Sequence, residues 1–294
     1  MTQPLQLISS GLFSAAIFFL VAAGLQLIFG VQKIINLAAG SFYALGAYFG
    51  LTAANWAIGH GLPQPLFVLA LIVGGLALGV FGPLFERFLS PIYERDEAFQ
   101  LLLTFALLLM LEDAMRFIWG GAAQSTGTFY LVYGQAEILG ATVPVYNLVV
   151  IAASVLVAAG LAFMLACTSF GRILRATADN REMAEALGVN MRLVYMKVFT
   201  LGMVLGTLGG ALVVPAIAPR SEMGIDILVE AFAVVVIGGL GSMWGALAAA
   251  ILVGLIRAFS ISIFPAAEML VVYLLVIVVL VLRPQGLFGR ENVA

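Results

Sequence analysis

The sequence contains little charge for its length. Only 13 residues are Lys or Arg and 15 are Asp or Glu among 294, while 63% are hydrophobic. The mean hydropathy is +1.15. A soluble globular surface needs far more charge, so this composition excludes a soluble domain. The net charge of −2 and the lack of a basic run also argue against nucleic acid as a partner.

Residues that carry chemistry are equally scarce. Cys167 is the only cysteine and His60 the only histidine, so the sequence allows no internal disulfide and no cysteine metal cluster. His60 lies between two glycines, which predicts a loop position. The two lysines, Lys33 and Lys197, do not follow a glycine, so the chain lacks the phosphate-binding loop of an ATPase. We therefore expect no cofactor, no metal and no catalytic site, and any ATP must bind to another subunit.

Long hydrophobic runs are what the sequence has in quantity. Runs near 20 residues recur along the chain, and about 20 apolar residues are what a helix needs to cross a bilayer. The runs do not alternate between polar and apolar residues, as the strands of a membrane barrel would. They predict an all-α, polytopic transmembrane helical bundle that occupies residues 1–294 as a single domain. The predicted spans are 9–30, 36–54, 64–86, 98–119, 145–167, 198–218, 225–241, 243–264 and 267–283.

Two of these runs need interpretation. The run at 225–241 ends in a glycine-rich stretch and could begin a re-entrant turn, so we expect about 8–10 spans. The run at 9–30 has no basic residue before it and is longer than the core of a signal peptide, which predicts a retained span.

Basic residues indicate which loops face the cytoplasm. Residues 168–197 hold five of the thirteen Lys and Arg, whereas 120–144 hold none. We expect 87–97, 168–197 and the C-terminus on the cytoplasmic side and 120–144 outside. Nine crossings would also place the N-terminus outside.

Two segments broken by glycines form a weak internal repeat. They are "NLAAGSFYALGAYFG" at 36–50 and "EAFAVVVIGGLGSMWG" at 230–245. Glycine-interrupted segments at corresponding positions of two halves are typical of a transporter's substrate path. Because polar groups are costly against lipid, we expect Asn36, Ser41 and Glu230 to lie near a central cavity. Other spaced glycines predict close helix packing.

The ionisable residues that we place within the membrane are few. They are Glu112, Asp113, Arg116, Glu230, Arg257 and Glu268. Glu112 and Arg116 are four residues apart with the acid first, which predicts a helical ion pair near the membrane interface. Glu230 is deeper, and deep carboxylates are functional as a rule, so a secondary transporter with its own ion or proton site stays open. No histidine, metal pair or nucleophile motif accompanies Glu230, which argues against catalysis on a membrane substrate.

Charge is concentrated in one stretch, "GRILRATADNREMAEALGVN" at 171–190. Asp179 suits the N-cap of a helix, and Glu182 three residues later makes a pair like a capping box. Gly188 is well placed to end the helix. The pattern predicts a helix of about two turns over 180–187.

Such a short helix is marginal in water, so it needs a surface on which to pack. Met183, Ala186 and Leu187 fall on one side of it and would form the buried face. The alternative interpretation is a positive-inside anchor, which would need only the basic residues. Because the stretch also carries three acids, we interpret it as a docking element.

Three stretches together resemble one family of transport proteins. They are "GLQLIFGVQKIINLAAGSFYALGAY" near the start, the stretch at 171–190, and "VIGGLGSMWGALAAAILVGLI" followed by "LRPQGLFG" near the end. From about residue 10 to 290, the sequence resembles the permease subunits of bacterial ABC importers for branched-chain amino acids, the smaller of the two permease types. The resemblance implies a membrane subunit that moves a small polar solute inward and is not an enzyme.

The resemblance also implies how the chain is coupled to ATP. Glu182, Ala184 and Gly188 match an importer signature in which Glu-Ala-Ala precedes a nearby Gly. Met183 stands where that signature has an alanine. In such importers this cytoplasmic loop, here 168–197, carries a coupling helix that the ATPase receives. The coupling residues implied are Arg172, Arg175, Asp179, Arg181, Glu182, Met183, Ala184, Leu187 and Gly188.

The implied partners are two ATP-binding subunits, a second permease subunit, identical or homologous, and a periplasmic solute-binding protein. The implied location is the bacterial cytoplasmic (inner) membrane, with lipid around the helices. Related permeases resemble those for urea, short amides or other small organic solutes, so these remain alternatives to branched-chain amino acids. A structural or lipid-modifying membrane protein is a further alternative.

Overall fold

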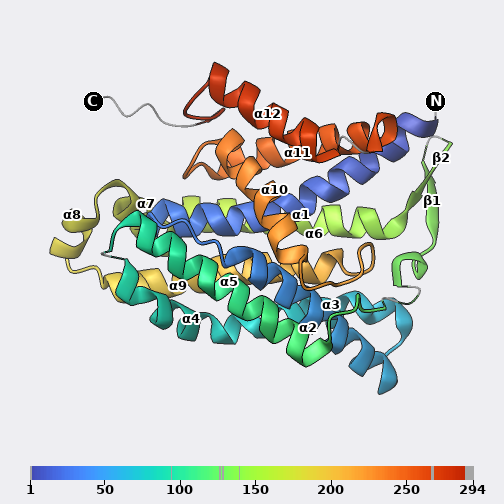
Figure 1. Cartoon of the computed structure of the whole chain (residues 1–294), viewed down its shortest axis with the longest axis horizontal. Coiled ribbons are helices and arrows are strands. Elements are labelled where there is room, and N and C mark those ends of the chain that lie inside the picture. Colours follow the sequence, from blue (N-terminus) through green and yellow to red (C-terminus); the bar gives the residue numbers. More distant parts are fainter. Residues whose placement is uncertain are drawn as a thin grey trace.

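Helices account for most of the described chain. The computed structural model describes residues 2–93, 95–125, 127, 129–138, 140–265 and 268–288. Its long helices are α1 (Thr2–Gln32), α2 (Ala39–Gly59), α5 (Glu97–Trp119), α6 (Val145–Cys167), α9 (Met191–Val213), α10 (Met223–Gly238), α11 (Met243–Ile263) and α12 (Glu268–Leu282). They pack as a helical bundle (Figure 1), which confirms the predicted fold class.

Every predicted span contains a helix, although several ends differ. α6 matches the predicted 145–167, whereas α9 begins at Met191 instead of residue 198 because the side chain of Asn190 caps it. α10 ends at Gly238 after 16 residues, which is short for a full crossing. Within the described residues, five stretches are long and apolar enough to span a membrane: Pro4–Gln32, Gln64–Leu89, Val145–Cys167, Met191–Val213 and Met243–Ile263.

The run predicted at 64–86 is a broken helix. It consists of the 3₁₀ turn η1 (Gln64–Leu66), α3 (Phe67–Ala77), the 3₁₀ turn η2 (Leu78–Phe81) and α4 (Gly82–Leu89), and η3 (Ser90–Ile92) follows. Near the break, a Cβ on Gly79 would lie 2.5 Å from Val204, and one on Gly82 would lie 2.6 Å from Thr200. The glycines therefore let this element lie close against α9.

Glycines also set how closely the central helices approach one another. A Cβ on Gly24 of α1 would lie 2.5 Å from the carbonyl oxygen of Gly202 in α9. One on Gly46 of α2 would lie 2.1 Å from the carbonyl oxygen of Thr207, also in α9. The predicted packing role of spaced glycines is confirmed at these contacts. α1 is buried along most of its length between α6, α9, α10 and α11.

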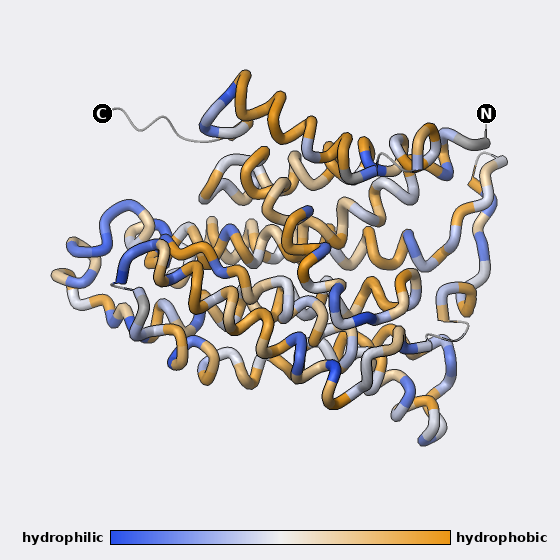
Figure 2. Tube along the Cα trace, viewed as in Figure 1, coloured by the Kyte–Doolittle hydropathy of each residue, from blue (hydrophilic) through white to orange (hydrophobic). Residues whose placement is uncertain are grey.

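The 120–144 segment, predicted to be outside, and the 168–197 loop, predicted to be cytoplasmic, lie at opposite ends of the bundle. The 120–144 segment contains η4 (Phe129–Leu131) and an antiparallel hairpin of β1 (Gln135–Ile138) and β2 (Ala141–Pro144), which the sequence did not predict. Gln6 Nε2 donates to the carbonyl oxygen of Thr142 at 3.2 Å, so the start of α1 lies beside the hairpin. The helices of the 168–197 loop, α7 (Ser169–Asp179) and α8 (Arg181–Ala186), lie at the other end (Figure 1). Figure 2 shows hydrophilic residues at this end and also in the loops at the opposite end.

Candidate functional site

Three helix caps shape the predicted coupling loop. The side chains of Thr168, Asn180 and Asn190 each accept a hydrogen bond from the backbone N–H three residues further on, at 3.0, 2.9 and 3.2 Å. Each cap satisfies one of the N–H groups that the first turn of a helix leaves without a partner. The loop therefore consists of defined helices, and α8 protrudes from the end of the bundle (Figure 1).

The predicted N-cap of α8 is wrong by one residue. Asp179 is the last residue of α7, and Asn180 occupies the cap position with extended backbone angles (φ −151°, ψ 102°). Glu182 is therefore the second helical residue and not the third, so Asp179 and Glu182 do not occupy the two positions of a capping box. Glu182 still lies in the first turn, where the helix dipole favours a negative charge.

The predicted end of α8 is confirmed. Gly188 has φ of 86°, a left-handed conformation that glycine adopts without strain. Its N–H bonds to the carbonyl oxygen of Glu185 at 2.9 Å, and that of Val189 bonds to the carbonyl oxygen of Ala184 at 3.1 Å. This pair of bonds is the Schellman motif, so α8 has fixed ends within the predicted range 180–187.

The apolar residues of α8 divide between two sides. Ala184 is buried against the rest of the chain, whereas Met183 and Leu187 are 58% and 79% exposed. Arg175 Nη1 donates to the carbonyl oxygen of Leu165 and so helps to hold α7 against α6. The exposed pair on a short, capped helix is the kind of surface that a partner covers. Its role in docking stays a prediction.

Tyr195 in α9 connects α8 to the membrane-embedded helices. The guanidinium of Arg181 lies over its ring. Tyr93 packs edge-on against the same ring, with 5.5 Å between the centroids and an angle of 81°. Burial raises the pKa of the Tyr93 hydroxyl. The carbonyl oxygen of Tyr195 accepts a hydrogen bond from Gln32 Nε2 at 3.0 Å.

The chain is interrupted at two places within the bundle. Residues 33–38 separate α1 from α2, and 239–242 separate α10 from α11. Gln26 of α1 holds the second interruption, because its Oε1 accepts a hydrogen bond from Gly241 N at 2.5 Å. Its Nε2 donates to the carbonyl oxygen of Gly239 at 2.9 Å. One buried side chain thus closes the turn between α10 and α11.

The two interruptions meet at Asn36. This residue is buried, and together with Leu240 it lines a cavity of about 10 Å³. Its Oδ1 accepts a hydrogen bond from Ala38 N at 3.1 Å, while its Nδ2 is buried without a hydrogen-bond partner. In the predicted repeat, Asn36 and Glu230 held corresponding positions in the two segments. In the structure, Glu230 lies inside α10, and the second interruption begins only after Gly238, about two helical turns further along the chain.

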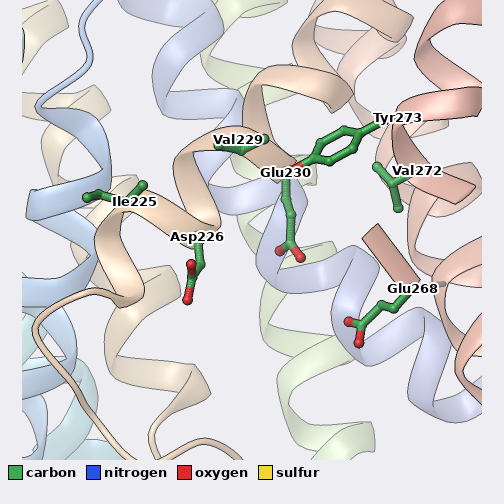
Figure 3. Close-up of a pocket in the computed structure, with 7 residues that line it drawn as sticks. All are labelled: Ile225, Asp226, Val229, Glu230, Glu268, Val272 and Tyr273. Atoms are coloured by element: carbon green, nitrogen blue, oxygen red, sulfur yellow. The ribbon is translucent and has the colours of Figure 1, made fainter. Parts of the chain in front are cut away.

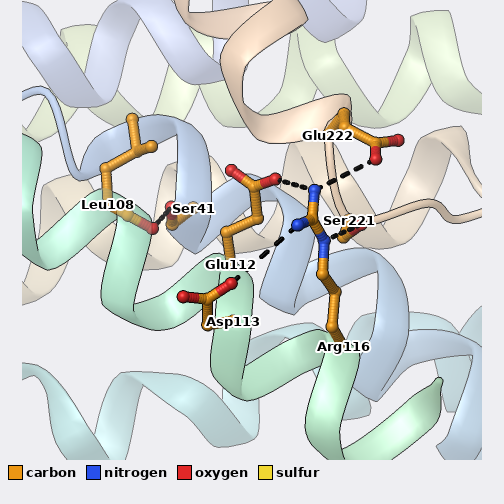
Figure 4. Close-up of polar contacts among 7 residues, drawn as sticks. All are labelled: Ser41, Leu108, Glu112, Asp113, Arg116, Ser221 and Glu222. Atoms are coloured by element: carbon orange, nitrogen blue, oxygen red, sulfur yellow. Dashed lines mark hydrogen bonds and ion pairs between the residues drawn. The ribbon is translucent and has the colours of Figure 1, made fainter. Parts of the chain in front are cut away.

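Ser41 and the predicted Glu112–Arg116 pair lie on the side of the bundle that α5 covers (Figure 4). Ser41 Oγ donates to the carbonyl oxygen of Leu108 in α5 at 3.0 Å. Arg116 Nη2 lies 2.5 Å from Glu112 Oε1, which confirms the predicted ion pair. The same nitrogen lies 3.1 Å from Glu222 Oε1, so the pair extends to the residue before α10.

Glu230 shares an arginine with a carboxylate from another helix. Arg257 of α11 lies 3.1 Å from Glu230 Oε1, and its Nε donates to Glu268 at the start of α12. A cavity of about 200 Å³ adjoins this triad. Figure 3 shows its lining residues, Ile225, Asp226, Val229, Glu230, Glu268, Val272 and Tyr273. The sequence identified each of these three charged residues separately. Residue spacing does not predict that they form ion pairs, because they come from three different helices.

The three predicted path residues do not share one cavity. Asn36 lines the small cavity, Ser41 lies in the contact between α2 and α5, and Glu230 lines the larger cavity. Their place on a translocation path stays a prediction. Among the described residues, no group of three or more His, Cys, Asp or Glu side chains is placed to hold a metal ion.

Comparison with known proteins gives one consistent family. A family model described as branched-chain amino acid transport system / permease component matches residues 7–280. The high-affinity branched-chain amino acid transport system permease protein BraD of Pseudomonas aeruginosa is 27% identical over 298 residues, which cover 98% of this chain and 97% of that protein. The corresponding protein LivH of Escherichia coli (strain K12) is 27% identical over 98% of this chain and 96% of its own length.

Two further similarities have lower coverage or lower identity. The fructose import permease protein FrcC of Rhizobium meliloti is 28% identical over 237 residues, which cover 76% of this chain and 64% of that protein. The alignment with the solved structure of PsaBC from Streptococcus pneumoniae in complex with Fab covers 93% of this chain and 89% of that chain. Its TM-score is 0.48 and the sequence identity is 13%.

Proposed function

Because this chain belongs to the permease family of branched-chain amino acid transport systems, we propose that it forms the membrane pathway of an ATP-driven importer for these amino acids. The observation that carries the proposal is the family match over residues 7–280, supported by permeases of that name that align with 98% of the chain. The chain is then a transport subunit and not an enzyme. ATP is bound and hydrolysed by separate subunits.

The coupling site of this importer is the exposed side of α8. One ATP-binding subunit docks there. Another docks on a second permease subunit, which is identical or homologous to this chain. Met183 and Leu187 provide the apolar centre of the contact, because both are exposed on a helix whose ends are fixed. Arg181 and Glu182 surround that centre, and Arg172 extends the charged rim onto α7. Apolar anchors inside a polar rim are the usual arrangement of a protein interface.

The opposite end of the bundle receives the solute. A periplasmic solute-binding protein delivers it to the end that carries the β1–β2 hairpin, and α8 faces the cytoplasm. The basic residues of the 168–197 loop support this orientation, and the family supports a location in the bacterial inner membrane.

A second candidate is a permease of the same kind for another small solute. The similarity to a fructose import permease supports this candidate, and urea or short amides belong to the same group of alternatives. The chain receives its solute from a binding protein, so the solute is decided in part by that partner.

Reconstituted transport tests both candidates. The permease pair, its ATP-binding subunits and its binding protein are assembled in liposomes, and uptake of labelled leucine, isoleucine, valine, fructose and urea is measured with and without ATP. We expect ATP-dependent uptake of the three amino acids only. Uptake of fructose or urea in their place would reassign the solute, and leucine uptake without ATP, driven by an ion gradient, would contradict an ATP-driven importer.

A further inference from the structure

The chain that follows α12 turns back toward α10. Pro284 disfavours a helical conformation of Arg283, so α12 ends at Leu282. The N–H of Gly286 donates to the carbonyl oxygen of Arg283 at 2.9 Å, which closes a four-residue turn with proline in its second position. We call residues 283–288 the strap, because the residues after this turn lie across the end of α10.

The strap satisfies the last carbonyl groups of α10. The final carbonyl groups of a helix have no partner within the helix itself. Here the carbonyl oxygen of Ile237 accepts a hydrogen bond from the N–H of Leu287 at 2.8 Å. That of Gly238, the last residue of α10, accepts one from the N–H of Phe288 at 3.1 Å. A segment that lies beyond α12 therefore completes the end of α10.

Gly286 allows the strap to lie directly on the backbone of α10. It is buried and has φ of 80°, a left-handed conformation that favours glycine. A Cβ at this position would lie 2.6 Å from the Cα of Gly239 and 2.7 Å from the carbonyl oxygen of Val236. Any larger residue would push the strap away from α10.

The strap and Gln26 hold the same part of the chain. Gln26 of α1 bonds to the backbone of Gly239 and Gly241 in the α10–α11 turn, 239–242. The strap bonds to the two residues that precede this turn. The turn is therefore fixed to α1 by a side chain and to the end of α12 by the backbone of the strap.

The α10–α11 turn closes against Asn36 of the other interruption. Leu240 in the turn and Asn36 line a cavity of about 10 Å³, which has room for about one water molecule. The space between the two interruptions is therefore closed to a solute in this structure. The Nδ2 of Asn36 is buried there without a hydrogen-bond partner, and that cost would be relieved if the turn moved away and water entered.

We propose that the strap holds the α10–α11 turn against Asn36 in the resting importer and that its release opens the translocation path on the cytoplasmic side. Gln26 lies within two turns of the end of α1, so the α10–α11 turn lies toward the end of the bundle that carries α8 (Figure 1). Loss of two backbone hydrogen bonds shifts such an equilibrium about tenfold or more. This role rests on the proposed import function and assigns the strap a step in its cycle.

Thiol labelling tests whether the strap keeps the space between the interruptions closed. Cys167 is first replaced by serine, and Ile34→Cys then places a thiol at a buried position in the wall of the small cavity. Gly286→Ala displaces the strap, because its Cβ has no room. Gly59→Ala is the control, because a Cβ there meets no neighbour within 4 Å.

The assembled transporter, in inside-out vesicles without ATP, is treated with a cationic methanethiosulfonate that does not cross the membrane. We expect the thiol at position 34 to react about tenfold faster in the Gly286→Ala background than in the Gly59→Ala background. Pull-down of the ATP-binding subunits should be normal in both. Equal labelling rates would overturn the proposed role of the strap.

A truncation removes the strap without adding a side chain. Deletion of residues 284–294 should raise the labelling rate as much as Gly286→Ala does. Deletion of residues 291–294 is the control, because it leaves residues 283–288 in place. Slow labelling of the chain that lacks 284–294 would overturn the proposal, whatever the Gly286→Ala substitution does to assembly.

Hydrogen exchange follows the strap in the unmodified complex. The amides of Leu287 and Phe288 should exchange slowly in the nucleotide-free importer. They should exchange at least tenfold faster while ATP and the loaded binding protein drive transport. An equal exchange rate in the two states would show that the strap does not release, which contradicts the proposal while the import function stands. Absence of ATP-dependent uptake by the unmodified complex would instead refute the proposed function.

Discussion

The guanidinium carbon of Arg181 lies 5.5 Å from the centroid of the Tyr195 ring. Arg181 is the first residue of α8 and Tyr195 lies in the first two turns of α9, so the contact ties the coupling helix to a membrane-spanning helix. Through its carbonyl oxygen, Tyr195 also holds Gln32 near the end of α1. A displacement of α8 would therefore reach α9 and α1 through one residue. These contacts form a continuous physical connection from α8 to α1.

Replacement of Tyr195 by leucine should uncouple ATP hydrolysis from transport. The change removes a cation–π contact worth about 0.5–1 kcal/mol. It also removes an aromatic contact with Tyr93 worth about 0.5–1.5 kcal/mol. The exposed side of α8 is unchanged, so pull-down of the ATP-binding subunits should be normal. We expect leucine uptake to fall several-fold while hydrolysis by the assembled complex continues, as measured in parallel on the same liposomes.

The control is Tyr195→Phe, which keeps the ring and both of its packing contacts. It should retain most of the uptake. A Tyr195→Leu complex that transports normally, or a Tyr195→Phe complex that is equally impaired, would show that the ring contacts do not link α8 to the bundle.

A charge in the centre of the proposed ATPase contact should weaken docking. Leu187→Asp places a carboxylate on the exposed C-cap residue of α8, and truncation of interface anchors typically costs about 2 kcal/mol or more. Pull-down of the ATP-binding subunits and leucine uptake should both fall. The matched control is Leu131→Asp, the same substitution at an exposed leucine at the opposite end of the bundle. Membrane insertion should be normal in both variants. Unchanged pull-down in Leu187→Asp would contradict the docking role and favour the alternative interpretation of residues 171–190 as a positive-inside anchor.

α8 illustrates what local sequence can predict. Gly188 was identifiable because the left-handed conformation that ends a helix favours glycine over the neighbouring residues. The N-cap was harder, because Asp179 and Asn180 are adjacent and both residue types cap helices well. The choice between them depends on where α7 ends, and α7 is held by contacts with α6 and α9 that no local pattern shows.

Contacts between distant segments account for most of what the sequence did not predict. The Glu112–Arg116 pair follows from a spacing of four residues on one helix, and it was predicted. Its extension to Glu222 and the triad around Arg257 join helices that are far apart in sequence. Hydrophobic runs located the helices because burial in lipid requires a fixed length. The same runs contain no information on which helix faces which.

Gln26 should be essential for the turn between α10 and α11. Gln26→Leu keeps the volume of the side chain but leaves Gly241 N–H and the carbonyl oxygen of Gly239 without this partner. The carbonyl oxygen of Gly239 still accepts a hydrogen bond from Ser242 N, so the loss is that of two hydrogen bonds, each worth about 0.5–1.5 kcal/mol, and the thermal stability of the purified complex should fall. Gln6→Leu on the same helix is the control, because Gln6 makes an exposed hydrogen bond to the hairpin. Equal melting temperatures for the two variants would mean that the turn is held by other contacts.

Two glycines four residues apart in α9 should respond in opposite ways to alanine. A Cβ on Gly210 would lie 1.8 Å from the carbonyl oxygen of Tyr43 in α2, whereas one on Gly206 would lie no closer than 3.7 Å to any neighbour outside its own helix. Gly210→Ala must push α2 away from α9, and overpacking of this kind costs about 1–3 kcal/mol. Gly206→Ala adds a methyl group in ordinary contact and gains up to about 1 kcal/mol from the higher helix propensity of alanine. The melting temperature of the complex should therefore fall for Gly210→Ala and hold or rise for Gly206→Ala. If both variants melt like the unsubstituted complex, α2 and α9 are not packed as closely as these positions require.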